Sequence, residues 1–424
     1  MSDLPEARRL LEAGRITEAE RAFERVLDED PQNGAALGGL GEAALRRGDA
    51  DRALELLRRA IVSAPSDPAI HQQLGRAHEL CADYGAAAAA YAAAVRLEPR
   101  LFSARLHLAS CLERTRELDA AVVQYKRALD DAQRQGQWLD RGSTPALLRP
   151  LVEHAVVAVR RGRHAVFDRL FAPLRARYGH GSLSRLERCV RIFLNEEPPE
   201  YPDPRQRPTF LFFPGLPTHA YFDRAIFPWI DSLEAATTAI DAELEPLLRS
   251  GSGRERVLAD ELQEATSLRG TDEPPSWTGY YFYRHGVRRD DNCAACPSTA
   301  RALDALPLCR IRAHGPEVHF SVFTAGTHLL PHCGVTNTRV VGHLPLIVPE
   351  DCALSVGGEV HHWRRGRVVV FDDTFEHEAW NRSRTTRVIL IFDIWNPYLT
   401  EVERAALTEL VGAIGDFRMA VEQA

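Results

Sequence analysis

Apolar and small residues in the first third of the chain recur with a period of 34 residues. The equivalent positions are Ala19, Ala53, Ala87 and Ala121; Phe23, Leu57, Tyr91 and Tyr125; Pro31, Pro65 and Pro99; Leu40, Leu74 and Leu108; and Gly41, Gly75 and Ala109. Each copy predicts two amphipathic helices that cross at the small residues, with a large apolar residue filling the gap. Because one such pair cannot bury its own apolar face, we expect four copies, from about residue 4 to about residue 133, to stack into a superhelix.

A helix pair repeated four times at this period resembles the tetratricopeptide repeat. Apolar stripes from Leu147 to Cys189 no longer keep the period but still predict a pair of capping helices, so the predicted solenoid covers residues 1–194. Arrays of this kind commonly hold a peptide or a partner protein in their groove, and we expect such a partner here. A purely structural spacer is the alternative, and helix-forming residues alone do not identify the partner.

The amino-acid composition changes at residues 195–208, which contain five prolines and almost no aliphatic residues. This composition predicts a stiff, extended and solvent-exposed linker between two domains. The second domain is therefore expected to cover residues 209–424. It opens with a short strand at Thr209, followed by an amphipathic helix from Phe227 to Leu248.

Short apolar runs separated by Gly, Pro and Asp predict a β-rich second domain. The expected strands are residues 280–283, 318–323, 339–348, 353–356, 367–371 and 386–394. Many short strands with a helix at one end suit a double-stranded β-helix, the jelly-roll arrangement of cupins and oxygenases. The predicted fold class is thus multidomain α + β: an all-α repeat solenoid followed by a jelly-roll domain with flanking helices.

Composition narrows the setting in which the protein works. The formal charge of −7 is mild and the basic residues are dispersed, so neither nucleic acid nor a membrane surface is the expected partner. The eight cysteines form no disulfide framework, the N-terminal residues lack a signal-peptide core, and no apolar stretch approaches the length of a membrane span. We expect a cytoplasmic protein.

Two histidines and an arginine in the second domain suggest a metal centre. His332 follows a turn, His377 lies 45 residues later, and Arg387 opens an apolar strand ten residues after that. Iron favours imidazole, and an oxygenase needs open coordination positions for co-substrate and oxygen. A buried guanidinium requires a partner, and its planar fork suits the far carboxylate of 2-oxoglutarate; a structural salt bridge is the alternative. Ser321, in the middle of a predicted strand, is a candidate second donor to that carboxylate.

Other arrangements of histidine and cysteine carry less weight. His328 and His332 have the spacing of a helical zinc pair, but Pro331 argues against a helix there. His361 and His362 belong to a polar hairpin and are expected at the surface. Cys293, Cys296 and Cys309 resemble part of a zinc site, but a single Cys-x-x-Cys pair leaves these thiols unassigned.

From Phe210 to Tyr398, about half of the chain, the sequence resembles the aspartyl/asparaginyl β-hydroxylases, which depend on Fe(II) and 2-oxoglutarate. The strings that carry the resemblance are Thr-His-x-x-Pro-His-x-Gly at 327–334 and Phe-Glu-His-Glu at 375–378. Further family-like segments are residues 213–216, 288–293, 346–349 and 393–397. Other oxygenases would not share the two strings.

The resemblance implies roles for individual residues. It places iron on His332 and His377, with Gly334 where other oxygenases carry an acidic ligand. It places the 2-oxoglutarate contacts on Tyr283, Ser321, His343 and Arg387, and it matches Arg339 to the first arginine of a family motif near the substrate.

Two departures from the family pattern concern the substrate and the cysteines. Val341 stands where the second arginine of that motif is expected, which removes a cation near the inner end of the co-substrate or the substrate acid. Ala300 stands where a disulfide partner of Cys293 or Cys296 is expected. The identity of the substrate is the expectation that these departures weaken most.

The resemblance therefore predicts a dioxygenase that uses Fe(II), 2-oxoglutarate and O2 to hydroxylate the β-carbon of an Asp or Asn side chain. The substrate is a protein, a peptide or a small molecule, recruited by the repeats. Two alternatives stay open: a halogenating relative, since a glycine in the acid position leaves room for chloride, and a non-catalytic adaptor with a degenerate barrel. The set His332, His377, Ser321 and Arg387 favours an active oxygenase.

Overall fold

The computed structural model describes residues 3–271 and 274–424. The chain divides into two compact units: residues up to Asp168 together with Asp416–Ala424, and Arg169–Gly415. The predicted domain limits at residues 194 and 208 remain a prediction.

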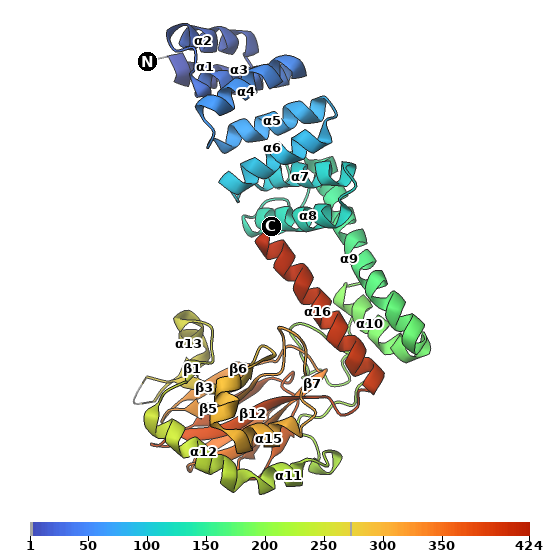
Figure 1. Cartoon of the computed structure of the whole chain (residues 1–424), viewed down its shortest axis with the longest axis vertical. Helices are drawn as coiled ribbons and strands as arrows, with labels where there is room; N and C mark the ends of the chain where they lie inside the picture. Colours follow the sequence, from blue (N-terminus) through green and yellow to red (C-terminus); the bar gives the residue numbers. More distant parts are fainter. Residues whose placement is uncertain (1–2, 272–273) are drawn as a thin grey trace. The chain divides into compact units, whose positions relative to one another are not determined.

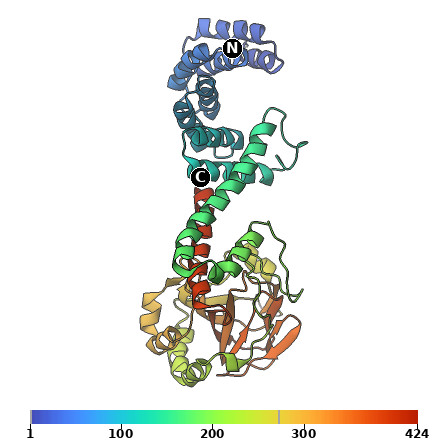
Figure 2. The ribbon, with the colours of Figure 1, turned by 90° about the vertical axis from the view of Figure 1, so that its right-hand side faces the viewer.

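The first unit contains the repeats. Their helices are α1 (Asp3–Glu12), α2 (Ile16–Glu29), α3 (Gly34–Arg47), α4 (Ala50–Ser63), α5 (Pro68–Leu80), α6 (Tyr84–Leu97), α7 (Phe102–Arg114) and α8 (Leu118–Arg134). They stack in chain order, as Figures 1 and 2 show in blue to cyan. The helix starts repeat as well: the side chains of Asn33 and Asp67, and those of Asp49 and Asp83, accept hydrogen bonds from backbone N–H groups of the first turn. The prediction of four helix pairs is confirmed.

Close helix crossing in the repeats depends on glycine. A Cβ at Gly41 would stand 2.6 Å from the Leu57 side chain, and one at Gly75 would stand 2.8 Å from the Tyr91 ring. Leu57 and Tyr91 are fully buried, as are the equivalent Phe23 and Tyr125. The large residue of each copy therefore fills the space that a small residue leaves free, as the period predicts.

Three further helices are α9 (Arg149–Tyr178), α10 (Ser184–Phe193) and α16 (Glu401–Gln423). The apolar stripes that predicted a pair of helices between Leu147 and Cys189 (residues 151–159 and 167–174) both lie on the single long helix α9, and α10 follows after the 3-10 turn η1 (Gly181–Leu183).

The second unit is built on two antiparallel sheets. The strands are β1 (Glu255–Arg256), β2 (Leu268–Arg269), β3 (Trp277–Arg284), β4 (Val287–Arg288), β5 (Val318–Phe323), β6 (His328–His332), β7 (Arg339–Ile347), β8 (Cys352–Val356), β9 (Glu359–His362), β10 (Val369–Phe371), β11 (His377–Asn381) and β12 (Arg387–Trp395). The larger sheet has the order β1-β3-β5-β12-β7-β10, with β4 paired to β3. The smaller sheet has the order β2-β6-β11-β8-β9. Six of these strands coincide with the predicted ones.

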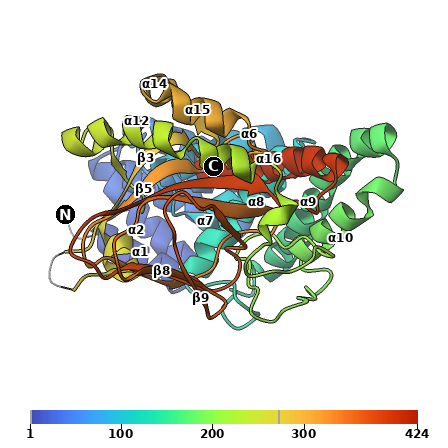
Figure 3. The same cartoon turned by 90° about the horizontal axis from the view of Figure 1, so that it is seen from below.

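Helices cover the outer face of the larger sheet. They are η2 (Arg224–Ile226), α11 (Ile230–Ala235), α12 (Thr237–Ser250), α14 (Asp290–Ala295) and α15 (Pro297–Asp304), while α13 (Glu261–Ser267) leads into β2. Figure 3 shows α12, α14 and α15 on one side of β3 and β5, with β8 and β9 on the other. Leu233, Ile240, Leu303, Phe320 and Leu390 meet in one apolar cluster between these helices and the sheet. The inner face of the sheet is thus free to line a cavity.

The last residues of the predicted linker pack against the sheets. Gln206 is only 1% exposed, and its Nε2 donates to Asp372 Oδ2 over 2.7 Å. The backbone N–H of Arg207 donates to Thr374 O over 2.7 Å. The expectation that residues 195–208 are solvent-exposed is therefore wrong at Gln206, because Asp372 is a buried acceptor that needs a donor; Arg205 and Arg207 on either side are exposed.

Within residues 3–271 and 274–424, no helix combines the length and the apolar character that crossing a membrane requires.

Candidate functional site

A cavity of about 360 Å³ lies between the two sheets of the second unit. Side chains from the inner faces of both sheets line it. Six of the seven residues predicted to act in the site belong to this lining: Ser321, His332, Arg339, His343, His377 and Arg387. The structure thus brings together residues that span 67 positions of the sequence (321 to 387).

His332 and His377 face each other on neighbouring strands of the smaller sheet. They are paired in register between β6 and β11, and their ring centroids lie 4.1 Å apart. His332 Nδ1 lies 2.9 Å from Leu330 O, and His377 Nδ1 lies 3.0 Å from Phe375 O. A carbonyl oxygen only accepts, so each Nδ1 carries a proton, and Nε2 is the ring nitrogen that remains for a metal. Burial, reinforced by His332, lowers the pKa of His377 to about 3. The two Nδ1 hydrogen bonds fix the orientation of both rings, as the hydrogen-bond partners of metal-binding histidines do.

The acidic group near this pair comes from Asp373 and not from position 334. A Cβ at Gly334 would stand 2.2 Å from the Asp373 carboxyl carbon, so glycine is the residue that fits. Burial raises the pKa of Asp373, which Arg339 opposes, and Asp373 Oδ1 has no hydrogen-bond partner among the described residues. In the part of the chain that the structure describes, His, Cys, Asp and Glu side chains form no group of three that could hold a metal ion. The assignment of a metal to His332 and His377 stays a prediction.

Arg387 is a buried cation that forms no ion pair with any acidic residue in the part of the chain that the structure describes. It is 2% exposed, and its Nη1 donates to Ser321 Oγ over 3.1 Å. Its guanidinium lies 3.7 Å from the ring centroid of Phe323, and its Nε has no hydrogen-bond partner in the described chain. Burial lowers its pKa to about 9. Because a buried charge needs a counterion, this end of the cavity suits a ligand carboxylate; no salt bridge to the described residues satisfies Arg387.

Two more histidines form the wall beside Arg387. His343 packs with its ring centroid 4.9 Å from that of Phe371, and burial, followed by the charge of Arg387, holds its pKa well below the usual value. His319 packs 4.7 Å from Tyr281 by the same measure, and burial, with Arg387, lowers its pKa to about 3. Among the described groups, both His319 nitrogens and His343 Nδ1 lack hydrogen-bond partners. These neutral rings leave polar atoms available to a ligand.

Tyr283 does not lie with the other predicted residues. Its hydroxyl accepts a hydrogen bond from Arg310 Nη1 over 2.9 Å, and its ring belongs to the apolar cluster on the outer face of the sheet. A register shift in β3 between Tyr281 and Tyr283 accompanies this change of side. On the same strand, Trp277 does contact the site: its Nε1 donates to Ser321 Oγ over 2.9 Å. The placement of Tyr283 against the co-substrate is therefore corrected.

Arg339 lines the cavity at the end away from Arg387. Its Nη1 lies 2.6 Å from Asp393 Oδ1, and its Nη2 lies 3.3 Å from Asp373 Oδ2. Burial would lower the pKa of Arg339, but the two aspartates outweigh it and raise that pKa above the usual value. The residue predicted to contact substrate is already paired with two protein carboxylates.

Trp277, Tyr281, His319 and Asp373 also line the cavity, and sequence reasoning missed them. A signal was available for His319, which lies two residues before Ser321 and so shares its face of the strand. His328 and His332 both lie on strand β6, which rules out a helical zinc pair, and His328 Nε2 lies 2.7 Å from Glu378 Oε2.

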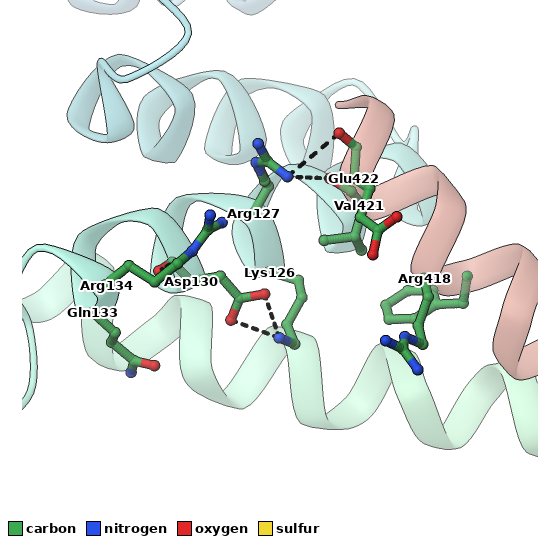
Figure 4. A pocket seen from close by; sticks show the side chains of 9 residues that line it. Lys126, Arg127, Asp130, Gln133, Arg134, Arg418, Val421 and Glu422 are labelled. Carbon is green, nitrogen blue, oxygen red and sulfur yellow. Dashed lines mark hydrogen bonds and ion pairs between the residues drawn. The ribbon is translucent and has the colours of Figure 1, made fainter. Parts of the chain in front are cut away.

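A second pocket lies in the first unit and differs in kind. It has a volume of about 670 Å³ and lies between α8 and residues 417–422 (Figure 4). Its charged groups are largely paired with each other: Lys126 lies 2.5 Å from Asp130, and Arg127 Nη1 donates to the carbonyl oxygens of Val421 and Glu422. Among the described residues, its lining contains no histidine, whereas the cavity between the sheets gathers the predicted residues and is the candidate active site.

Each of the two predicted parts of the chain matches a known protein family model. Residues 234–397 match the family model for aspartyl/asparaginyl β-hydroxylase, and residues 4–68 and 75–136 match that for the tetratricopeptide repeat. The second part of the chain therefore contains a domain similar to the aspartyl/asparaginyl β-hydroxylases, and tetratricopeptide repeats precede it.

The relatives have different activities in their names. An ornithine lipid ester-linked acyl 2-hydroxylase of Rhizobium tropici is 35% identical, over 42% of this chain and 60% of its own length. Human aspartate β-hydroxylase domain-containing protein 2 is 32% identical, over 54% of this chain and 61% of its own length. Human aspartyl/asparaginyl β-hydroxylase is 35% identical, over 34% of this chain and 19% of its own length. The chain thus spans less than two thirds of each of these relatives.

Solved structures similar to the repeats include YrrB, a TPR protein with an unusual peptide-binding site. It is 19% identical, over 30% of this chain and 66% of its own, with a TM-score of 0.29. MamA from Desulfovibrio magneticus RS-1 is 22% identical, over 31% of this chain and 75% of its own, with a TM-score of 0.30.

Proposed function

We propose that the protein is a hydroxylase that depends on Fe(II) and 2-oxoglutarate, with its active site in the cavity between the two sheets. The observation that carries this proposal is Arg387, a buried guanidinium without an acidic partner among the described residues, in the same cavity as a pair of metal-competent histidines. A cation at one end and a metal pair further along suit a ligand with a carboxylate at each end.

The residues present fit both implied groups. His332 and His377 would hold iron through Nε2, and Asp373 would place a carboxylate close to that pair. When bound, iron with 2-oxoglutarate and O2 supplies the oxidising power that turns a C–H bond into C–OH, leaving succinate and carbon dioxide. Arg387 and Ser321 would hold the far carboxylate of the co-substrate, and Trp277 fixes the Ser321 hydroxyl by donating to it.

Positioning and exclusion of water are the tasks of the remaining chain. His319 and His343 stay neutral, so they add hydrogen-bonding atoms without adding charge near the co-substrate. Phe323 and Phe371 are 1% and 2% exposed and seal the wall around Arg387 and His343. A dry, preorganised cavity strengthens the ion pair between Arg387 and a bound carboxylate.

The reactions in the names of two relatives share one chemical feature, the position of the hydroxylated carbon. The β-carbon of an Asp or Asn side chain is bonded to that side chain's carbonyl carbon. Carbon 2 of an ester-linked acyl chain is likewise bonded to the ester carbonyl carbon. We propose that this protein hydroxylates a carbon next to a carbonyl group, and that the repeats recruit the peptide or protein which carries or delivers the substrate.

The halogenase alternative is disfavoured by Asp373. The space that a side chain at Gly334 would take is filled by the Asp373 carboxylate. A halide beside the histidine pair would therefore lie against another anion, which is costly in a buried site.

Turnover of 2-oxoglutarate tests the proposal. Purified protein is incubated anaerobically with Fe(II) and 2-oxoglutarate, oxygen is added, and succinate is measured. We expect succinate that His377→Ala and Arg387→Ala abolish, while the matched variants His328→Ala and Arg384→Ala keep it. A protein that binds neither iron nor 2-oxoglutarate would leave a non-catalytic adaptor as the better account.

A further inference from the structure

We infer that the carbonyl group next to the reacting carbon is uncharged, as in an amide or an ester, and that Val341 sets this selectivity against a carboxylate. The inference rests on the proposed function and names the substrate class of the same site. It follows from which residues line the substrate end of the cavity and how their charges are paired.

The sheet pairings place Val341 far from the co-substrate anchor. Along β12 the inward residues run from Arg387 through Ile389 and Ile391 to Asp393. Asp393 pairs in register with Val341, whereas Arg387 pairs with Phe323 at the other end of the strand. If Arg387 holds one end of the co-substrate, Val341 and Asp393 lie at the end that remains for the substrate.

The charged groups at the substrate end are already paired. Arg339 is bound by Asp393 and Asp373, and Arg284 forms an ion pair with Glu255. Glu317 lines the same end, where His285 Nδ1 lies 3.0 Å from it. Both arginines at this end therefore have acidic partners within the described chain.

An additional carboxylate would enter this end among Asp373, Asp393 and Glu317. It would find no described arginine at that end without an acidic partner. Bringing an unpaired charge into a buried site is unfavourable, because the charge loses its hydration without gaining a counterion. An amide or ester carbonyl carries no charge and avoids that cost.

The cavity wall suits the same substrate. Val341 lies between Asp393 and Phe371 in register, and Leu329, Leu354 and Ala379 line the facing sheet. These side chains provide an apolar surface for the carbon chain beside the carbonyl group. Val341 has no polar atom in its side chain and so offers nothing that a carboxylate needs.

Matched pairs of probes test the inference by binding. Calorimetry on the full chain, loaded with Mn(II) and 2-oxoglutarate, compares N-acetyl-asparagine N-methylamide with N-acetyl-aspartate N-methylamide, and ethyl butanoate with butanoate. We expect the wild-type protein to bind the uncharged member of at least one pair at least tenfold more tightly. The pair that responds tells whether the amide or the ester is the source of the carbonyl.

Substitution at Val341 provides the matched comparison. Val341→Arg adds a cation at the substrate end and is expected to reverse the preference toward the acid, while Val341→Leu keeps it. Three results with the wild-type protein would overturn the inference: equal affinity within both pairs, no binding of any of the four probes, or tighter binding of the acids. The wild-type comparison stands even if Val341→Arg does not fold.

The same titrations separate this inference from the proposed function. Binding of 2-oxoglutarate is measured first, without any probe. If it fails, the proposed function fails; if it succeeds and the probes show no preference, only the substrate class is wrong.

Discussion

Arg387 and Ser321 lie on neighbouring strands, β12 and β5, with the Arg387 Nη1 3.1 Å from the Ser321 Oγ. This hydroxyl is a neutral acceptor for a buried cation that has no acidic partner in the described part of the chain. In a protein built for stability alone, such a charge would be paired or replaced. The relationship therefore indicates a binding role for Arg387, and it predicts how stability responds when the charge is removed.

Arg387→Met is expected to stabilise the protein without ligands. Removing a buried, unpaired charge is worth on the order of 1–4 kcal/mol when the replacement fills the same volume. Five of the six tryptophans (229, 277, 363, 380 and 395) lie in the second unit, so urea unfolding followed by tryptophan fluorescence reports mainly on this unit. A variant that unfolds at lower urea than the wild type would contradict the argument.

The same residue predicts a pH dependence. Burial lowers the pKa of Arg387 to about 9 in the folded protein, well below the pKa of an ordinary guanidinium in the unfolded chain. Between these values the unfolded chain binds more protons, so the free energy of unfolding rises as pH increases above about 9. We expect this component in the wild type and its loss in Arg387→Met, measured by urea unfolding at a series of pH values from 8 upward. Parallel curves for the two proteins would show that Arg387 does not titrate in this range.

Trp277 and Tyr283 should differ in their effect on co-substrate binding. Trp277 donates to the Ser321 hydroxyl, so Trp277→Phe frees that hydroxyl and is expected to weaken 2-oxoglutarate binding by roughly tenfold, the worth of one such hydrogen bond. Tyr283→Phe removes only the acceptor of Arg310 on the outer face and should leave the affinity unchanged. Calorimetry measures the 2-oxoglutarate affinity of both variants. If Tyr283→Phe weakens binding and Trp277→Phe does not, the original prediction that Tyr283 contacts the co-substrate would be restored.

This pair of aromatic residues shows where sequence reasoning fails. The strand from Trp277 to Arg284 could be predicted from its apolar residues, but which side chains face the cavity depends on the register shift between Tyr281 and Tyr283. No local pattern indicates a bulge of this kind. A single such shift moves every later side chain to the opposite face.

Other parts were predictable because their signal repeats or is chemically specific. The helix pairs follow from positions such as Leu57 and Tyr91, which recur with the same 34-residue period in successive repeats. His332, His377 and Arg387 could be selected because their residue types suit one chemistry. Asp373 could not, because its place beside Gly334 depends on how two loops meet in space.

Gly334→Ala tests the close approach of Asp373. A Cβ there would stand 2.2 Å from the Asp373 carboxyl carbon, so the variant must displace that carboxylate or the loop. We expect loss of stability on the order of 2 kcal/mol, as for other overpacked sites, together with weaker metal binding. Gly334→Ala combined with Asp373→Ala should recover stability, measured by thermal unfolding. An undisturbed single variant would show that the two groups do not meet.

We expect that the repeats can be destabilised without loss of activity at the active site. In Gly75→Leu, the new side chain meets the Tyr91 ring, which lies 2.8 Å from the position of a Cβ. We expect a loss of helical stability of about 1–3 kcal/mol. Gly48→Leu controls for the size of the new side chain, because a Cβ at Gly48 would meet no atom within 4 Å. This variant adds backbone strain, since Gly48 has a φ of 77°. Gly14→Leu, with nothing within 4 Å at a φ of 75°, is a second control for that strain.

Both readouts are needed for the repeat variants. Circular dichroism at rising temperature measures the helices, and succinate formation without added substrate measures the active site. The account expects Gly75→Leu to change the first and not the second. Loss of succinate formation at temperatures where the helices are intact would show that the repeats act on catalysis directly.

The central claim is that one cavity holds both iron and 2-oxoglutarate, and anaerobic calorimetry tests it most directly. 2-Oxoglutarate is titrated into the protein with and without Fe(II), and into His377→Ala, Arg387→Ala and the control Arg384→Ala. The account predicts one 2-oxoglutarate per chain, bound more tightly with iron, with affinity reduced on the order of 100-fold by Arg387→Ala, as for a lost charge-assisted pair. Binding that ignores iron, His377 and Arg387 would contradict it.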